Sequence, residues 1–288
     1  MSNKLPGITT YYPRSPQLKT YVQYYYFMQS DNPSFNSKYF VFPNTNISLN
    51  IHKNVSFSFT DNKVDISGSN KKNTAAIVMG MRKLPVLVNL EGKLDKLTVV
   101  FHPLGLNHFL NDPYLSVAVK EAQLFNSWDE NAGYKRFVQQ FYQTGDHDQR
   151  IHLLERFLLS VYRPIKEYDQ LKKSVELLSD FSEEKTIAEI SKIIEMPERT
   201  FSRAFHREVG VSPIRFKKIA RFRHSLRNKL FNEQFKRLTQ IGHASNFYDQ
   251  AYFINIYKQL TRQNPAAFFR GIDKLADDNL ILSFVKAG

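Results

Sequence analysis

A run of cationic side chains between residues 213 and 229 is the part of the sequence whose residue types most clearly suggest chemistry. Guanidinium and ammonium groups form charge-assisted hydrogen bonds with phosphate oxygens. At helical spacing these groups lie on the side of a helix away from its apolar residues. They are Arg215, Lys217, Lys218, Arg221, Arg223, Arg227 and Lys229. The run therefore predicts a helix that contacts a polyanion.

The positive charge of the chain is concentrated around this run. The 288 residues carry a formal net charge of +13. Residues 186–272 contain 16 Lys or Arg and 6 Asp or Glu, a balance of +10. A concentrated excess creates a binding field, whereas a diffuse excess mainly improves solubility. A polyanionic partner is expected for this segment, with a solvated helical surface as the alternative.

Catalytic and metal-binding chemistry has much weaker support in the sequence. The chain contains no cysteine, which removes disulfides, thiolate nucleophiles and cysteine metal sites. His52, His102 and His108 are the candidate metal ligands, but no two of them share one face of a strand or helix with an acidic partner. A glycine-rich phosphate loop, a serine elbow and a paired-carboxylate motif are also absent. We expect no enzymatic activity, no metal and no cofactor.

The elements that must position the basic segment differ between the two halves of the chain. Residues 1 to about 101 contain eight short strand-like runs separated by turn residues, which suggests a β-barrel or sandwich. These runs are residues 21–29, 38–42, 47–51, 55–60, 64–67, 75–81, 84–90 and 94–101. From about residue 103 the apolar residues recur at helical period, and Pro164 ends the last helix of this region.

The helical half repeats itself at an offset of about fifty residues. Residues 201–216 and 253–268 place aromatic residues and a helix-opening proline at the same spacing. The matching pairs are Phe201 with Phe253, Phe205 with Tyr257, Pro213 with Pro265, and Phe216 with Phe268. Thr186 and Glu189 have the spacing of a capping box, so a helix starts there, and Gly210 is placed to end the next helix. Two copies of one helical unit are predicted.

This segment resembles the DNA-binding domain of the AraC/XylS-type bacterial transcription regulators, over about residues 170–272. The resemblance depends on Ser191 and Gly242 after their isoleucines, on residues 210–213, on Arg221 and on the run FYDQAYF at residues 247–253. It implies two helix-turn-helix units joined by a long helix. Two recognition helices that read one face of DNA lie roughly 34 Å apart, a spacing that a long helix can hold.

By this resemblance, the first recognition helix covers about residues 198–209 and the second about residues 249–260. Arginine can pair bidentately with guanine, and glutamine or asparagine with adenine, although an arginine can also contact phosphate alone. The expected DNA-binding residues are Arg199, Thr200, Ser202, Arg203, His206, Arg207, Lys217, Arg221, Gln250, Ala251, Ile254, Asn255 and Lys258.

The second copy departs from the family pattern at three positions. Asn246 stands where glycine usually makes the turn, Arg262 stands at the place of Gly210, and Asn255 replaces Arg203. The second recognition helix therefore keeps only Lys258 as a cation. We expect the first unit to supply most of the affinity and the second to add a modest sequence preference.

The amino-terminal half, through its opening residues 16–27 and residues 99–125, resembles the sensory half of one branch of these regulators. The resemblance implies a β-barrel with following helices that bind an effector or a second subunit. Four aromatic residues could line an effector pocket, although such residues more often form the core. They are Tyr24, Tyr26, Phe40 and Phe42.

The expected fold class is α+β. Residues 1–165 form a β-barrel-like effector-sensing or dimerisation domain with accessory helices, residues 170–272 the all-helical DNA-binding domain, and residues 273–288 a carboxy-terminal tail. The expected function is sequence-specific transcription regulation, with double-stranded DNA as partner and RNA polymerase, a small-molecule effector and a second copy of the chain as further partners. The alternatives are a non-specific architectural nucleic-acid-binding protein and a cupin-like metal enzyme fused to a DNA-binding domain. Without an apolar run of signal-peptide or membrane-span length, a cytoplasmic location is expected.

Overall fold

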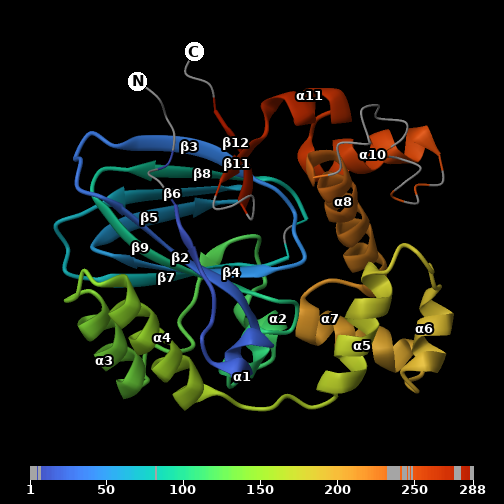
Figure 1. The fold of residues 1–288 in the computed structure, drawn as a ribbon, viewed down its shortest axis with the longest axis horizontal. Helices are drawn as coiled ribbons and strands as arrows, with labels where there is room; N and C mark the ends of the chain where they lie inside the picture. Colours follow the sequence, from blue (N-terminus) through green and yellow to red (C-terminus); the bar gives the residue numbers. More distant parts are fainter. Residues whose placement is uncertain are drawn as a thin grey trace.

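The computed structural model of the chain describes residues 5, 8–81, 83–231, 241, 245, 247, 249–275 and 280–285. A β-rich part formed by the amino-terminal half lies beside a helical part formed by the carboxy-terminal half (Figure 1). Gly242, a small residue of the family motif, and Asn246, at the expected turn of the second unit, lie outside the described residues.

The β-rich part contains two six-stranded sheets. The first sheet is antiparallel throughout and has the order β1 (Thr10–Tyr11), β2 (Val22–Ser30), β9 (Leu94–Phe101), β4 (Ile47–Lys53), β7 (Thr74–Met79) and β10 (Gln123–Leu124). The second sheet has the order β11 (Asp273–Leu275), β12 (Leu280–Phe284), β3 (Asn36–Val41), β8 (Val86–Glu91), β6 (Lys63–Gly68) and β5 (Val55–Thr60). Only the β6–β8 pair in it is parallel.

The alternation of side chains along each strand determines which layer a residue joins. In β4, Ile47, Leu49 and Ile51 belong to the apolar core beneath the helices of the β-rich part. The alternate residues Ser48, Asn50 and His52 face the second sheet. The predicted α+β architecture with a β-rich amino-terminal part is confirmed, and its two sheets face each other without closing into a barrel.

Five short or medium helices complete the β-rich part. They are α1 (Pro16–Lys19), the 3-10 helix η1 (Leu106–Phe109), α2 (Tyr114–Val117), α3 (Ala132–Phe141) and α4 (His147–Val161). The last two pack on the outer face of the first sheet (Figure 1). Arg150 of α4 makes a bidentate pair with Asp95 of β9 at 3.0 and 3.1 Å, which fixes the helix against the sheet.

The helical part consists of α5 (Tyr168–Ser179), α6 (Ile187–Ile193), α7 (Glu198–Val209), α8 (Pro213–Phe231), α10 (Gln250–Thr261) and α11 (Pro265–Gly271). The predicted capping box is present: Glu189 N donates to Thr186 Oγ1, and the Glu189 carboxylate accepts from Thr186 N. Gly210 ends α7 at φ +83°, and Asn264 caps α11 by accepting from Ala267 N. Local sequence signals therefore set the helix ends.

The last described residues return to the β-rich part. In β12, Leu282 pairs with Val41, Ser283 with Phe40 and Phe284 with Tyr39 of β3. The segment expected as a carboxy-terminal tail thus supplies the edge strands of the second sheet, beside β3 in Figure 1.

The two parts also share apolar cores. Met81 and Leu104 of the β-rich part pack with the core of α6 and α7. Phe42 packs with the core of α8, α10 and α11, where its ring lies 4.8 Å from that of Phe268. The helical part is therefore held against the sheets by buried apolar surface as well as by β12.

Candidate nucleic-acid interface

The sequence repeat specifies one aromatic packing arrangement twice. In the first copy (α6, α7 and the start of α8), the Phe205 ring lies edge-on to Phe201 at 5.6 Å and to Phe216 at 5.5 Å. In the second copy (α10 and α11), the Tyr257 ring lies 4.7 Å from Phe253 and 5.6 Å from Phe268. Because these rings are buried, α7 in the first copy and α10 in the second turn their opposite faces outward.

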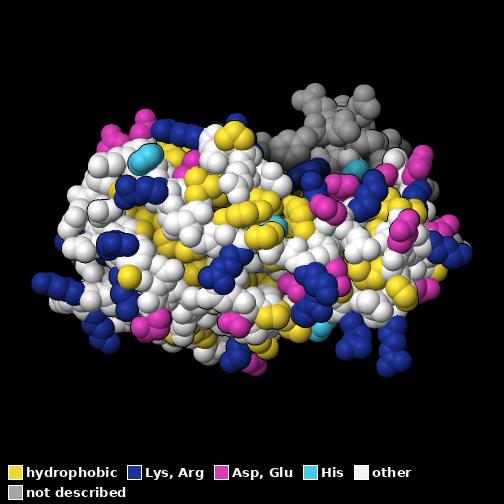
Figure 2. Space-filling view, turned by 90° about the horizontal axis from the view of Figure 1, so that it is seen from below, with side chains coloured by type: hydrophobic (Ala, Val, Ile, Leu, Met, Phe, Trp, Pro, Cys, Tyr) yellow, Lys and Arg dark blue, Asp and Glu magenta, His cyan; other side chains and the backbone are white. Residues whose placement is uncertain are grey.

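The outward face of α7 carries most of the residues predicted for it. Arg199, Thr200, Arg203 and His206 are exposed, and Ser202 is half-buried. On the face seen in Figure 2, Lys and Arg side chains project from the surface of the helical part. A guanidinium group held on an exposed helix face can reach a base edge or a phosphate.

Arg207 is exposed but already has partners within the chain. Its Nε donates to Glu208 Oε1 at 2.6 Å, and a terminal nitrogen lies 3.4 Å from Glu167 Oε2. A group that is satisfied by two carboxylates has less to gain from a phosphate, so its contact with DNA would require exchange of partners.

The outward face of α10 is polar with a single cation. Gln250, Ala251, Asn255 and Lys258 are exposed, and Ile254 is half-buried. The face is linked to α8 by a chain of hydrogen bonds. Gln259 Nε2 donates to Asn255 Oδ1 at 3.1 Å, and Lys218 Nζ donates to Gln259 Oε1 at 3.0 Å.

Lys217 and Arg221 have partners within the chain, and the DNA contact expected of them stays a prediction. Their side chains are 18% and 12% exposed, and both pair with Glu184. Lys217 Nζ also donates to the Lys185 carbonyl at 2.8 Å, and the Arg221 guanidinium lies 5.3 Å from the Phe181 ring. Both cations therefore fasten the segment before α6 to α8 and are turned away from solvent.

The β-rich part packs against the end of α7. Asn107 of η1 donates from Nδ2 to the carbonyl and to the Oε2 of Glu208, both at 2.9 Å. A Cβ atom at Gly210 would lie 2.8 Å from the ring of Tyr114 in α2. These contacts join η1 and α2 to the end of α7, the helix with the exposed arginines.

The four aromatic residues predicted for an effector pocket do not come together. Tyr26 lines a cavity between the two sheets, and Tyr24 stacks beside it at 6.5 Å in a buried cluster. Phe40 is half-buried against the core that contains Phe42, and this core belongs to the second copy of the helical unit. Of the four, Phe40 and Phe42 thus contact the helical part.

Sequence reasoning missed the polar residues of the cavity between the sheets. Asn50, His52 and Lys96 line it, and all three are buried. The signal was present in the alternation of residues 47–53, but such a pattern is normally read as a strand with its polar face in solvent. Of the other candidate histidines, His102 lines a cleft of about 520 Å³ between the two parts, and His108 stacks on Tyr162.

Two protein-family models match parts of the chain. A family model described as a helix-turn-helix domain matches residues 190–271, and a domain of unknown function, DUF6597, matches residues 10–119. The chain carries an AraC-type helix-turn-helix domain. This AraC-type domain contains α7 and α10, and it assigns the chain to DNA binding and transcription regulation. None of the curated proteins matches the chain.

Several solved structures of ToxT from Vibrio cholerae align with most of the chain. A 1.65 Å structure of its P21 form is 14% identical with a TM-score of 0.46, and the alignment covers 85% of this chain and 98% of that one. ToxT with a bound unsaturated fatty acid is 16% identical with a TM-score of 0.43, covering 85% and 94%. ToxT bound to (E)-4-(8-methylnaphthalen-1-yl)but-3-enoic acid is 15% identical with a TM-score of 0.39, covering 92% and 97%.

None of the helices in the described part of the chain is long and apolar enough to cross a membrane.

Proposed function

We propose that the chain is a sequence-specific transcription regulator that reads two adjacent major-groove segments with α7 and α10. The observation that carries the proposal is the repeated scaffold, which buries three aromatic rings in each copy and turns a polar helix face outward twice. A helix of this width fits the major groove, where all four base pairs can be distinguished.

The two faces suit different bases. Arg199 and Arg203 on α7 can each pair with guanine O6 and N7, and a good bidentate pair contributes about 1 to 3 kcal/mol of discrimination. On α10, Gln250 and Asn255 can pair with adenine N6 and N7. Since α7 carries the exposed arginines, the first copy supplies most of the affinity and the second adds sequence preference.

We further propose that an effector or a second copy of the chain changes how α7 is presented. The contacts that support this are those of Asn107 and Tyr114 with the end of α7, because they connect the β-rich part to the proposed reading helix. Promoter DNA is the primary proposed partner, and RNA polymerase is a further proposed partner at the promoter.

The test measures DNA binding with duplexes selected from a random library. Arg203→Ala should weaken binding to the selected duplex by about 5- to 160-fold, the loss expected for one bidentate arginine. Asn255→Ala should cost less. Arg136→Ala is the matched control, since Arg136 is an exposed arginine on α3 of the β-rich part, and it should leave the affinity unchanged.

Competition distinguishes this function from a non-specific architectural or RNA-binding role. Binding to the selected duplex should resist excess random duplex and single-stranded RNA, and it should fall with salt at a slope of about 0.9 per neutralised phosphate. Equal displacement by random duplex or RNA would contradict sequence-specific reading, and an Asn255→Ala loss equal to that of Arg203→Ala would contradict the unequal roles of α7 and α10.

A further inference from the structure

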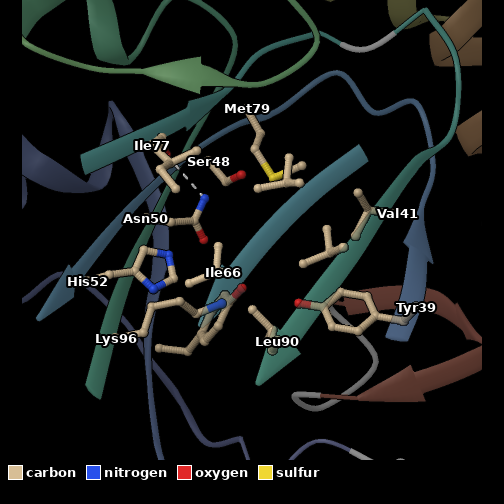
Figure 3. Close-up of a pocket in the computed structure, with 13 residues that line it drawn as sticks. Tyr39, Val41, Ser48, Asn50, His52, Ile66, Ile77, Met79, Leu90 and Lys96 are labelled. Atoms are coloured by element: carbon tan, nitrogen blue, oxygen red, sulfur yellow. Dashed lines mark hydrogen bonds between the residues drawn. The ribbon is translucent and has the colours of Figure 1, made fainter. Parts of the chain in front are cut away.

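A small cavity lies between the two sheets of the β-rich part, away from the helical units. Its volume is about 40 Å³. A cavity must have a volume of roughly 10 to 15 Å³ to hold one water molecule, so this cavity has room for a compact molecule of only a few heavy atoms. Figure 3 shows His52 and Lys96 side by side on one wall, with Tyr39 pointing toward them from the other side.

The walls of the cavity differ in chemistry. The second sheet supplies a mostly apolar wall through β3, β6 and β8, formed by Tyr39, Val41, Val64, Ile66, Val88 and Leu90. The first sheet supplies the polar wall through β4 and β9. In the register of these strands His52 lies directly opposite Lys96, and Asn50 lies opposite Thr98. A ligand in this cavity would therefore meet most of its polar groups on the first sheet, with the Tyr39 hydroxyl as a polar group of the second sheet.

Lys96 is a cation buried between the two sheets. It is 4% exposed, and its Nζ lies 5.2 Å from the centre of the Tyr26 ring. No carboxylate within the described part of the chain pairs with it. Asp95, the preceding residue, faces the opposite side of the sheet and pairs with Arg150. Burial of an ammonium group without a carboxylate partner is costly, so this position favours an anionic partner.

His52 adds an unsatisfied donor beside this cation. It is 1% exposed, and neither ring nitrogen has a hydrogen-bond partner among the residues that the structure describes. Burial, followed by the charge of Lys96, lowers the pKa of His52 well below its usual value. The ring is therefore neutral, with one N–H to donate. Asn50 differs, because its Nδ2 donates to the Ile77 carbonyl and its Oδ1 accepts from Thr98.

We propose that this cavity binds a short-chain monocarboxylate, with its carboxylate between Lys96 Nζ and a ring N–H of His52 and its alkyl group against Ile66 and Leu90. Two adjacent donors match the two oxygens of a carboxylate, and the apolar wall accommodates the short hydrocarbon. The volume limits the ligand to roughly two to four carbons. The monocarboxylate would be the effector of the proposed regulator, so its regulatory role rests on the proposed function.

The experiment measures binding of propionate to the full chain by calorimetry in a chloride-free buffer. Acetate, propionate and butyrate should bind, whereas propionamide, which has the same shape without the charge, should bind at least tenfold more weakly. Octanoate should not bind, because its chain exceeds the cavity. Equal binding of propionamide, absence of binding by all three acids, or equal binding of chloride would overturn the proposal.

Two lysine variants locate the site. Lys96→Met keeps the length of the side chain without its charge and should reduce propionate affinity at least tenfold. Lys93→Met removes an exposed lysine three residues earlier and should leave it unchanged. Unchanged binding by a folded Lys96→Met variant would overturn the assignment. If that variant does not fold, the comparison of propionate with propionamide on the unmodified chain decides. DNA binding is measured separately, so either activity can fail alone.

Discussion

In the first copy of the helical unit Gly210 ends α7 at φ +83°, whereas in the second copy Arg262 ends α10 at the matching position at φ +61°. The backbone turns the same way in both copies, but a glycine is required only in the first, where the Tyr114 ring lies against the turn. The second copy keeps a side chain at this conformation. The contact of the turn with Tyr114, more than the turn itself, therefore distinguishes the two copies.

The two copies also differ in what they expose and how they are held. The first exposes arginines on α7 and contacts η1 and α2 close to that helix. The second exposes a mostly uncharged face, and its scaffold packs on Phe42 through Phe268. The two copies of the scaffold thus differ: the first joins exposed charge to contacts with η1 and α2, and the second has a mostly uncharged outward face.

The largest expected effect is that of Gly210→Ala. A Cβ there meets the Tyr114 ring and forces an L-residue into the left-handed region, so the free energy of unfolding should fall by about 2 to 3 kcal/mol. Urea denaturation measures this loss. Gly145→Ala, with open space around its Cβ, is the control and should change little.

Arg262→Gly is the matching change in the second copy. It relieves about 1 kcal/mol of backbone strain but adds freedom to the unfolded chain, so the net change in the free energy of unfolding should stay within about 0.5 kcal/mol. A loss comparable to that of Gly210→Ala would show that the two turns are equally constrained.

An intermediate effect is expected from Asn107→Ala. This change removes the donor to the Glu208 carbonyl and to its Oε2, while Oε1 keeps Arg207, and it should lower the opening free energy of the end of α7 by about 1 to 2 kcal/mol. Hydrogen exchange should then rise roughly 5- to 30-fold in α7 and not in α10. Asn36→Ala, which removes an exposed hydrogen bond to Glu91, serves as control. Equal acceleration in both helices would indicate one cooperative unit.

The smallest effect is expected from Gln259→Ala. This change releases Asn255 and Lys218 from their shared hydrogen bonds, and exposed interactions of this kind contribute about 0.2 to 0.5 kcal/mol. Affinity for the selected duplex should rise by no more than about twofold. Gln139→Ala on α3 provides the control. A tenfold change in either direction would mean that the linkage to α8 dominates the orientation of α10.

Local signals in the sequence predicted much of the fold. The runs at residues 55–60 and 94–101 coincide with β5 and β9, and the other six predicted runs overlap β2, β3, β4, β6, β7 and β8. Alternating apolar residues define such strands whatever their partners are. The capping box at Thr186 and the left-handed end at Gly210 were equally readable, because both depend on residues within one turn of the chain.

Features that depend on distant regions of the chain could not be predicted. The pairing of β12 with β3 joins residues about 240 positions apart, and no local pattern specifies such a partner. The alternation in β4 predicted a strand but not that the face with Asn50 and His52 would point inward. Arg221 was recognised as a family position, but its pairing with Glu184 follows only from how the segment before α6 folds back.

The return of β12 to the edge of the second sheet means that the helical part is joined covalently to the β-rich part at both of its ends. One connection runs between α4 and α5, and the other is the passage from α11 into β11 and β12. Two covalent connections, together with the shared apolar cores, restrict motion of the helical part against the sheets more than one connection would. A chain shortened after residue 272 would lose the second connection and leave β3 as an open strand edge, available to any neighbouring chain.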